Sequence, residues 1–379
     1  MKDSIKIADI RHGRELKADY RMFGVKSAER VREFHKSFAE YNVTPLVSLD
    51  CFAEDIGLSG FFVKDESYRF GLNAFKVLGG SYAMSEYAKG DKKDITFVTA
   101  TDGNHGRGVA WAAGKMGCEA YVYLPRGSAE ERLQNIRSLG AHADIMDLSY
   151  DDAVRHAMKM ADENDWILIQ DTSWLGYEEI PKKIMQGYTT MGAEIREQLG
   201  SVVPTHIFLQ AGVGAMAGAM TGYFVDLYGK KCPKIIIVEP DKANCIYKTA
   251  KADDGKLHFF TGEMDSIMAG LCCGEPCGVA WDVLKERADY VISCPDEIAK
   301  KGMRILAKPI GTDRKIISGE SGAVTTGLVA EIMTNSELAF IREEIGLDKK
   351  SVVLCISTEG NTDKENYNKI VFGRNMTRE

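Results

Sequence analysis

The chain has 379 residues, which is enough for two domains at roughly 150 residues each. Its 48 Lys and Arg and 55 Asp and Glu give a net charge of −7, and without a long basic run this argues against nucleic acid or an anionic membrane as a partner. A hydrophobic fraction of 45% excludes global disorder, and nine scattered cysteines, an odd number, indicate reduced thiols in the cytoplasm and no disulfide framework.

Short apolar runs rich in β-branched residues alternate with longer amphipathic segments along the chain. This alternation predicts an α/β fold with open, twisted, mostly parallel sheets covered by helices. Residues 95–185 hold four short strand–helix units and are expected to form a small domain, with 1–94 and 186–379 forming a larger, discontinuous one. The predicted strands are 60–64, 96–99, 119–124, 142–146, 167–170, 205–210, 234–238, 290–293 and 352–357, and predicted helices include 74–89, 104–116 and 129–138.

The uncharged stretch 207–225 carries glycines at 214, 218 and 222. One interpretation is a membrane-spanning helix with a small-residue face, and the other is a buried strand, a glycine loop and a helix under a sheet. Four glycines and Gln210 make the stretch weakly hydrophobic, which favours the second interpretation.

The segment from Gln210 to Gly218 reads QAGVGAMAG and joins a predicted strand to a predicted helix. Glycines permit a tight turn, after which the first N–H groups of the helix point at an anion such as phosphate. Two alternatives remain: a dinucleotide site with Glu239 as the ribose acid, or glycines that serve helix–sheet packing.

Lys76 follows Phe75 at a predicted loop-to-helix junction and precedes small residues. Desolvation in a confined site would lower the pKa of its amine and make it a nucleophile for a carbonyl. The alternative is an ordinary solvated lysine.

The segment Thr101-Asp102-Gly103-Asn104-His105-Gly106 follows the 96–99 strand and opens a helix. Its N–H groups could hold a carboxylate or a phosphate. Asp102 is either a helix N-cap or a group that exchanges a proton or pairs with a ligand ammonium, and His105 is either functional or an interior histidine.

The segment Ser357-Thr358-Glu359-Gly360-Asn361 follows the last apolar strand. A hydroxyl at a strand end can hydrogen-bond a ring nitrogen without ionising it. By itself the segment also fits an ordinary polar turn.

In their order and spacing these four motifs resemble the fold-type II pyridoxal-phosphate enzymes, which include threonine and serine dehydratases, cysteine synthase and the tryptophan synthase β subunit. Thr44-Pro45-Leu46 and Val63-Lys64-Asp65-Glu66 are similar to the opening motifs of that family, and the resemblance runs from about Thr44 to Thr362. Within it, the diaminopropionate ammonia-lyases are the most similar group. The segments that carry this similarity are 73–76, 101–111, 170–172 and 318–323.

The resemblance implies a pyridoxal 5'-phosphate cofactor in a cleft between a large and a small domain, and a homodimer. Lys76 would form the imine with the cofactor, and either Thr358 or Ser357 would face the pyridine nitrogen; the Gly-Asn pair favours Thr358. The other implied cofactor contacts are Phe75, Asn104, Gly212, Val213, Gly214, Ala215, Met216 and Glu320. The implied substrate contacts are Thr101, Asp102, Gly103, His105 and Asp171.

The implied reaction is an α,β-elimination that converts 2,3-diaminopropionate to pyruvate and two ammonia. Lys76 and Asp102 are the expected catalytic residues. If Asp102 lies opposite Lys76, D- and L-isomers could both react, and Asp171 is a weaker candidate for the same region. A plain serine or threonine dehydratase is the alternative, although Ala74 and the pair Thr101-Asp102 replace serines usual in that group. A nicotinamide-dependent oxidoreductase is more distant, because it leaves Lys76 unexplained.

Cys272, Cys273 and Cys277 form a cluster, C-C-G-E-P-C. Its spacing does not match a zinc site, and no metal is expected. A redox-sensitive thiol pair at a site entrance is an alternative, with 262–278 as a mobile lid.

Overall fold

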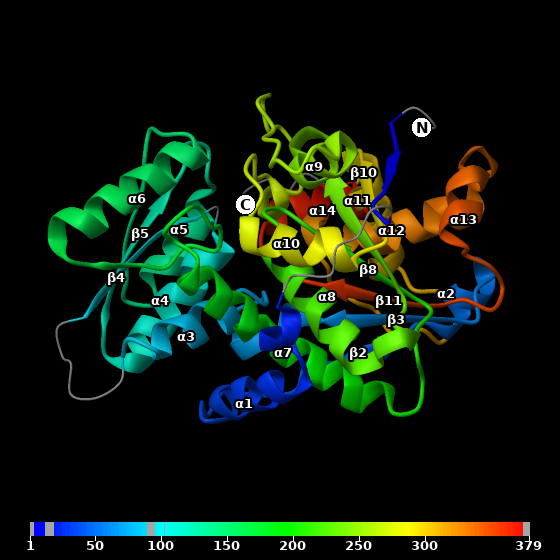
Figure 1. Cartoon of the computed structure of the whole chain (residues 1–379), viewed down its shortest axis with the longest axis horizontal. Coiled ribbons are helices and arrows are strands. Elements are labelled where there is room, and N and C mark those ends of the chain that lie inside the picture. Colours follow the sequence, from blue (N-terminus) through cyan, green and yellow to red (C-terminus); the bar gives the residue numbers. More distant parts are fainter. Residues whose placement is uncertain (1–3, 12–18, 89–94, 102, 374–379) are drawn as a thin grey trace.

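The computed structural model describes residues 4–11, 19–88, 95–101 and 103–373, and within them the strands form two separate sheets (Figure 1). The seven-stranded sheet has the order β1-β10-β9-β8-β11-β3-β2, and the four-stranded sheet has the order β6-β5-β4-β7. Strand bounds are β1 Lys6–Asp9, β2 Leu46–Ser48, β3 Gly60–Asp65, β4 Thr96–Ala100, β5 Glu119–Leu124, β6 His142–Ile145, β7 Ile167–Leu168, β8 His206–Gln210, β9 Lys234–Pro240, β10 Tyr290–Cys294 and β11 Val352–Ser357.

The pairing within both sheets is parallel except at the two edges of the larger one, where β1 pairs antiparallel with β10 and β2 with β3. The predicted α/β architecture with two mostly parallel sheets is therefore confirmed. Every predicted strand is present, within two residues at each end. The two edge strands were not predicted, because runs of three and four residues carry little periodicity and their pairing partners are distant in sequence.

Helices cover both sheets (Figure 1). Successive residues of one strand face different cores: Ile235 and Ile237 pack with α1, α7, α8 and α10, whereas Ile236 and Val238 pack with α2 and α11 to α14. The α-helix bounds are α1 Val25–Lys36, α2 Asp50–Asp55, α3 Val77–Ser85, α4 Asn104–Met116, α5 Glu130–Arg137, α6 Tyr150–Asn164, α7 Glu179–Leu199, α8 Ala215–Tyr228, α9 Cys245–Ala252, α10 Gly278–Arg287, α11 Asp296–Ala307, α12 Glu320–Thr334, α13 Ala339–Ile345 and α14 Lys364–Phe372. The 3-10 helices are η1 Tyr20–Phe23, η2 Glu66–Gly71, η3 Gly229–Lys231, η4 Asp241–Ala243, η5 Ala269–Leu271 and η6 Ser336–Leu338.

The four-stranded sheet lies within residues 96–168, inside the segment 95–185 predicted to be the small domain. In Figure 1 this sheet and helices α4 to α6 form one lobe, and the larger sheet forms the other. Helix α3 belongs to the predicted large domain but packs against both α4 and α7. The exact domain boundaries stay a prediction.

The uncharged stretch 207–225 folds as the end of β8, a glycine loop and α8, which is the second of the two interpretations. No helix in the described part of the chain is long and apolar enough to cross a membrane.

Helix α3 begins three residues later than the sequence predicts. Asn73 has a φ of 61°, Ala74 forms a β-bridge with Glu359, and the Phe75 N–H donates to the Thr358 carbonyl at 3.1 Å. This pairing with the chain that leaves β11 holds residues 73–75 out of the helix and places Lys76 at its N-cap.

Four charged side chains form a buried network where β3, η2 and α7 meet. The Lys64 ammonium donates to Glu194 at 2.7 Å, and the Arg69 guanidinium donates to both Glu194 and Glu66 at 2.8 Å. All four side chains have 0% exposure, and the Thr44 hydroxyl donates to Glu66 at 2.6 Å. The two motifs at the start of the family resemblance therefore join into one ionic cluster, in which two positive charges balance two negative ones.

Candidate active site

One cavity collects residues from the carboxyl ends of β8 and β11 and from the starts of helices α3, α4, α8 and α12. Parallel α/β sheets commonly bind ligands at this edge, where loops and helix N-termini converge. The described residues that line it are Phe75, Lys76, Asn104, Asp171, Tyr188, Gln210, Ala211, Gly212, Val213, Gly214, Ala215, Met216, Gly270, Leu271, Cys273, Ser321, Thr358 and Glu359.

The glycine loop forms one wall of the cavity and leads into α8. Gly214 has a φ of 96°, a conformation that side chains with a Cβ rarely adopt. A Cβ on Gly212 would lie 3.1 Å from the Cys273 sulfur and 3.2 Å from Leu271 Cα, so a side chain here would crowd both residues. The first turn of a helix has N–H groups without intrahelical partners, and here they sit beside the cavity. The loop is therefore built to hold an anion such as phosphate.

Lys76 extends into the cavity and forms an ion pair with Asp171, which follows the last strand of the small sheet. The Lys76 side chain is 18% exposed and that of Asp171 is 4% exposed. Burial by itself raises the pKa of the Asp171 carboxyl, but the Lys76 ammonium and the His105 ring outweigh it and bring the pKa down to about 2. A lysine in this setting is a confined amine with a fixed carboxylate beside it, not a solvated surface group.

Thr358 faces the cavity and Ser357 does not. The Thr358 hydroxyl accepts a hydrogen bond from Gln210 Nε2 at 3.1 Å, and Gln210 also donates to the Ser321 and Ile356 carbonyls. The Ser357 hydroxyl instead donates to Ser318 at 2.7 Å and is fully buried. Because successive residues of a strand point to opposite faces, only Thr358 can meet a ligand here.

Asn104 opens α4 and donates its amide N–H to the Glu359 carboxylate. Glu359 also accepts from the Ser321 N–H at 3.3 Å and the Thr362 hydroxyl at 3.4 Å. This carboxylate is 4% exposed and lines the cavity. It fixes the orientation of the Asn104 amide at the site.

The loop before α4 has a structural hydrogen-bond pattern. Thr101 Oγ1 accepts from the N–H groups of Gly103 and Gly106, at 2.9 and 3.1 Å, and His105 Nε2 lies 2.8 Å from the Ile169 carbonyl. None of Thr101, Gly103 and His105 is among the described residues that line the cavity. Their proposed substrate contacts stay predictions. Asp102 lies outside the described residues.

Glu320 begins α12, but its carboxylate accepts from Asn366, and Ser321 is the residue of that helix that lines the cavity. Burial and the neighbouring Glu359 raise the pKa of Glu320 to about 7. A cofactor contact by Glu320 also stays a prediction.

Glu239, the acid expected of a dinucleotide site, accepts hydrogen bonds from the backbone of the protein itself. Its carboxylate accepts from the N–H groups of Ile246 and Tyr247, at 2.9 and 2.7 Å, at the start of α9, and it has 0% exposure. It is therefore unavailable to a ribose, which removes the main support for the oxidoreductase alternative.

None of the nine cysteines forms a disulfide bond. Cys273 lines the cavity, whereas Cys277 is buried against the Ser173 hydroxyl and Cys272 donates to the Ser266 carbonyl. The described residues contain no group of three side chains suited to hold a metal ion.

Gln210, Glu359, Ser321 and Tyr188 line the cavity but were not predicted as site residues. Gln210 and Glu359 lie within the motifs 210–218 and 357–361, so assigning every residue of those motifs to the site would have found them. Tyr188 lies inside a long helix, and no local pattern distinguishes it there.

The cavity fits pyridoxal phosphate. It offers a helix N-terminus for a phosphate, an amine for the carbonyl carbon, a strand-end hydroxyl for a ring nitrogen and an aromatic ring, Phe75, at its edge. Two buried polar atoms at the site, Gln210 Oε1 and Ser321 Oγ, have no hydrogen-bond partner among the described residues, as expected where a polar ligand completes the site.

Comparison with known proteins agrees with this geometry. The family model for pyridoxal-phosphate-dependent enzymes matches residues 38–359. The diaminopropionate ammonia-lyase of Salmonella typhimurium is 49% identical over 90% of this chain and 91% of its own, and that of Escherichia coli K12 is 46% identical over 93% and 92%. The crystal structure of the Escherichia coli enzyme with an aminoacrylate–pyridoxal-phosphate reaction intermediate matches with a TM-score of 0.91 and 45% identity, over 97% of both chains.

A threonine deaminase of Solanum lycopersicum shares the fold at a TM-score of 0.73 and 20% identity. The much higher identity to the first group, over nearly the whole length of both chains, decides between the two. The chain belongs to the diaminopropionate ammonia-lyase family of pyridoxal-phosphate-dependent enzymes.

Proposed function

We propose that the chain catalyses the α,β-elimination of ammonia from 2,3-diaminopropionate, and that water then hydrolyses the released enamine product to pyruvate and a second ammonia. The observation that carries the proposal is the Lys76 amine, paired with the buried Asp171 carboxylate in a cavity that also holds an anion-binding helix terminus. The names of the relatives at 46% and 49% identity support the choice of substrate.

Bound pyridoxal phosphate supplies an electron sink for the electron pair left on Cα when its proton is removed. Residues Gly212 to Met216 would hold its phosphate through backbone N–H groups, Thr358 would contact the ring nitrogen, and Asn104 would contact the ring hydroxyl. A hydroxyl at the ring nitrogen leaves that nitrogen largely neutral, so electron withdrawal is moderate. This suits an elimination, in which the leaving group departs promptly.

Lys76 takes the proton from Cα. Ammonia leaves well only when protonated, so an acid must stand near Cβ. We assign that role, and the binding of the second ammonium, to Asp102 on the basis of its place in the loop before Asn104, with Asp171 as the second candidate. Two bases that reach Cα from different sides would allow both the D- and the L-isomer to react.

Substrate assays on the purified holoenzyme test this function. We expect pyruvate from 2,3-diaminopropionate, with two ammonia released for each pyruvate, measured by a coupled lactate dehydrogenase assay and an ammonia assay. Turnover of L-serine or L-threonine alone, with one ammonia per ketoacid, would make the chain a dehydratase. Absence of any visible cofactor band after addition of pyridoxal phosphate would contradict the assignment of the cavity.

Isomer-specific assays of variants test the two carboxylates. Asp102→Asn should reduce turnover of one diaminopropionate isomer at least tenfold more than the other. Equal, mild losses on both isomers would remove Asp102 from acid–base chemistry. Asp171→Asn tests the second candidate with the same two isomers. Asp165→Asn is its control, because Asp165 is an exposed helix C-cap at which Asn is well tolerated.

We propose a cytoplasmic location, which is supported by nine cysteines that form no disulfide bond. We also propose a homodimer on the family resemblance. Light scattering coupled to size exclusion tests the second point, and a monomer at micromolar concentration would contradict it.

A further inference from the structure

The hydroxyl of Tyr188 is a buried polar group that the protein leaves unused. Tyr188 lies on α7, is 1% exposed and lines the cavity, and among the described residues its hydroxyl has no hydrogen-bond partner. A buried donor without an acceptor carries an energetic penalty that phenylalanine would avoid. Its presence indicates that another state of the site satisfies it.

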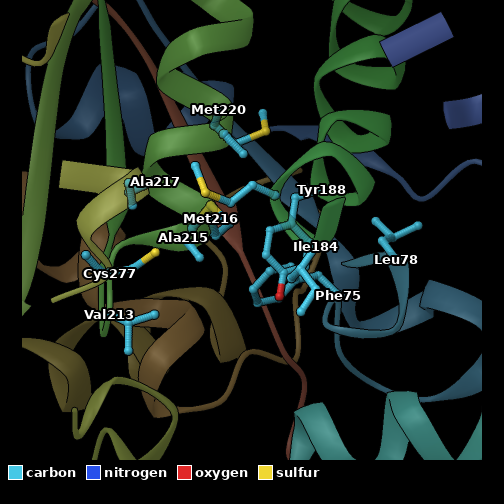
Figure 2. Close-up of a cluster of buried hydrophobic side chains, with 14 of the residues drawn as sticks. Phe75, Leu78, Ile184, Tyr188, Val213, Ala215, Met216, Ala217, Met220 and Cys277 are labelled. Carbon is cyan, nitrogen blue, oxygen red and sulfur yellow. The ribbon is translucent and has the colours of Figure 1, made fainter. Parts of the chain in front are cut away.

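Packing fixes the position of the Tyr188 ring. The ring lies 4.8 Å from that of Phe75, at an interplanar angle of 55°, and a Cβ on Gly79 would come within 2.6 Å of it. Figure 2 shows Tyr188 among Phe75, Ile184 and Met216, with the ring extending from α7 towards Phe75. The phenol is therefore held rigidly beside the residue that precedes Lys76.

Tyr188 lines the same cavity as Lys76 and Asp171, the two charged groups of the proposed reaction. Burial raises the pKa of Tyr188, the Lys76 charge lowers it and the Asp171 charge raises it, so the hydroxyl is protonated and can donate a hydrogen bond. Asp171 itself receives one side-chain hydrogen bond among the described residues, from Lys76. In the proposed function the Lys76 nitrogen binds the cofactor and then takes the Cα proton, which would leave the buried Asp171 carboxylate without its side-chain hydrogen bond from Lys76.

We propose that Tyr188 is a positioning residue, whose hydroxyl donates a hydrogen bond to the Asp171 carboxylate whenever Lys76 is engaged elsewhere. The inference rests on the proposed role of Lys76 but not on the identity of the substrate. The bond keeps Asp171 ionised and fixed while the lysine nitrogen gains and loses its proton. A buried carboxylate without such a donor would take up a proton instead.

The groups that face Asp171 come from several elements. They are Lys76 at the start of α3, His105 on α4, Tyr188 on α7, Tyr177 in the loop before α7, and Cys277 before α10. The Tyr177 hydroxyl is already committed, because it donates to the Leu168 carbonyl and accepts from the Gln170 N–H. Among the described tyrosines near Asp171, only Tyr188 has a hydroxyl to give.

The test compares Tyr188→Phe with the matched control Tyr367→Phe. The Tyr367 hydroxyl is also buried and lacks a hydrogen-bond partner among the described residues, but Tyr367 does not line the cavity. Both variants without cofactor should unfold at or above the wild-type temperature. With cofactor bound, the acid limb of the pH titration of its visible absorbance should move up by about one pH unit in Tyr188→Phe only. The direction follows because loss of a donor raises the pKa of Asp171.

The acid limb of kcat should move the same way, with KM changed less than twofold. An unchanged acid limb in Tyr188→Phe, or an equal shift in both variants, overturns the inference. So does a clear loss of stability in cofactor-free Tyr188→Phe, which would make the hydroxyl structural. The absorbance titration needs no substrate. If diaminopropionate is not a substrate, the proposed function is refuted, but the titration still tests the role of Tyr188.

Discussion

Replacement of Glu194 by Gln should destabilise the fold strongly, because it breaks a neutral cluster of buried charges. The carboxylate binds Lys64 and Arg69, and with Glu66 it balances their two positive charges at 0% exposure. Burial raises the pKa of Glu194, but Arg69 and Lys64 outweigh it and hold the pKa at about 2, so the group is charged at neutral pH. Glu194→Gln therefore leaves one positive charge buried and uncompensated.

The expected cost of such a broken pair is about 3–5 kcal/mol. For a chain of 379 residues the unfolding entropy is about 0.8 kcal/mol/K, so the unfolding temperature should fall by roughly 4–6 °C. Differential scanning calorimetry at neutral pH measures this fall.

The matched control is Glu179→Gln on the same helix. Glu179 pairs with Lys182 at the surface, where the two side chains are 79% and 26% exposed. A surface pair of this kind contributes about 0–1 kcal/mol, so the control should fall by no more than about 1 °C. Equal shifts in the two variants, or no shift in Glu194→Gln, would refute the reasoning that the network is held by charge balance.

Three further outcomes follow from the site and the core. Lys76→Ala should lose the visible band of bound cofactor, whereas the exposed Lys115→Ala should keep it, as an absorbance spectrum will show. Thr358→Val should weaken pyridoxal phosphate binding about tenfold in a titration. Ser357→Ala should leave the affinity unchanged, because the Ser357 hydroxyl bonds Ser318. Weaker binding in Ser357→Ala and unchanged binding in Thr358→Val would assign the ring nitrogen to Ser357. Burial and Arg69 lower the pKa of His35 to about 3 in the folded protein. As the pH falls from 7 to 5, the unfolded chain therefore takes up a proton at His35 and the folded protein does not, so the free energy of unfolding decreases by about 2 kcal/mol. Urea unfolding of His35→Gln should show a correspondingly smaller loss, and an equal loss would exclude His35 as its source.

The sequence by itself predicts the interior of the fold. Short apolar runs such as 205–210 and 352–357 indicate strands buried on both faces, and the glycines after Gln210 indicate a tight turn into a helix. These signals are local, because each depends on residues within one element. The same holds for the lysine at the start of α3 and for the motifs that together indicate the family.

The choice of side chains that meet in the cavity is decided by tertiary structure. Lys76 and Asp171 are 95 residues apart in sequence, and neither carries a sign of the other. Thr358 and Ser357 both carry a hydroxyl group. Only the direction of the chain at the end of β11 points the Thr358 side chain towards the cavity and the Ser357 side chain into the core. The start of α3 is likewise set by pairing with the chain after β11, which overrides the helical preference of residues 74–76.

Tyr188 and Glu194 lie on the same helix, α7, and both have neighbours that only the tertiary structure decides. The sequence predicts that such a long segment packs one face inward, but not that one buried residue completes an ionic cluster while another brings an unused hydroxyl to the cavity. Local sequence specifies backbone conformation because its energies act between near neighbours. Pairing of buried polar groups depends on which distant segments meet, and the packed fold alone determines that.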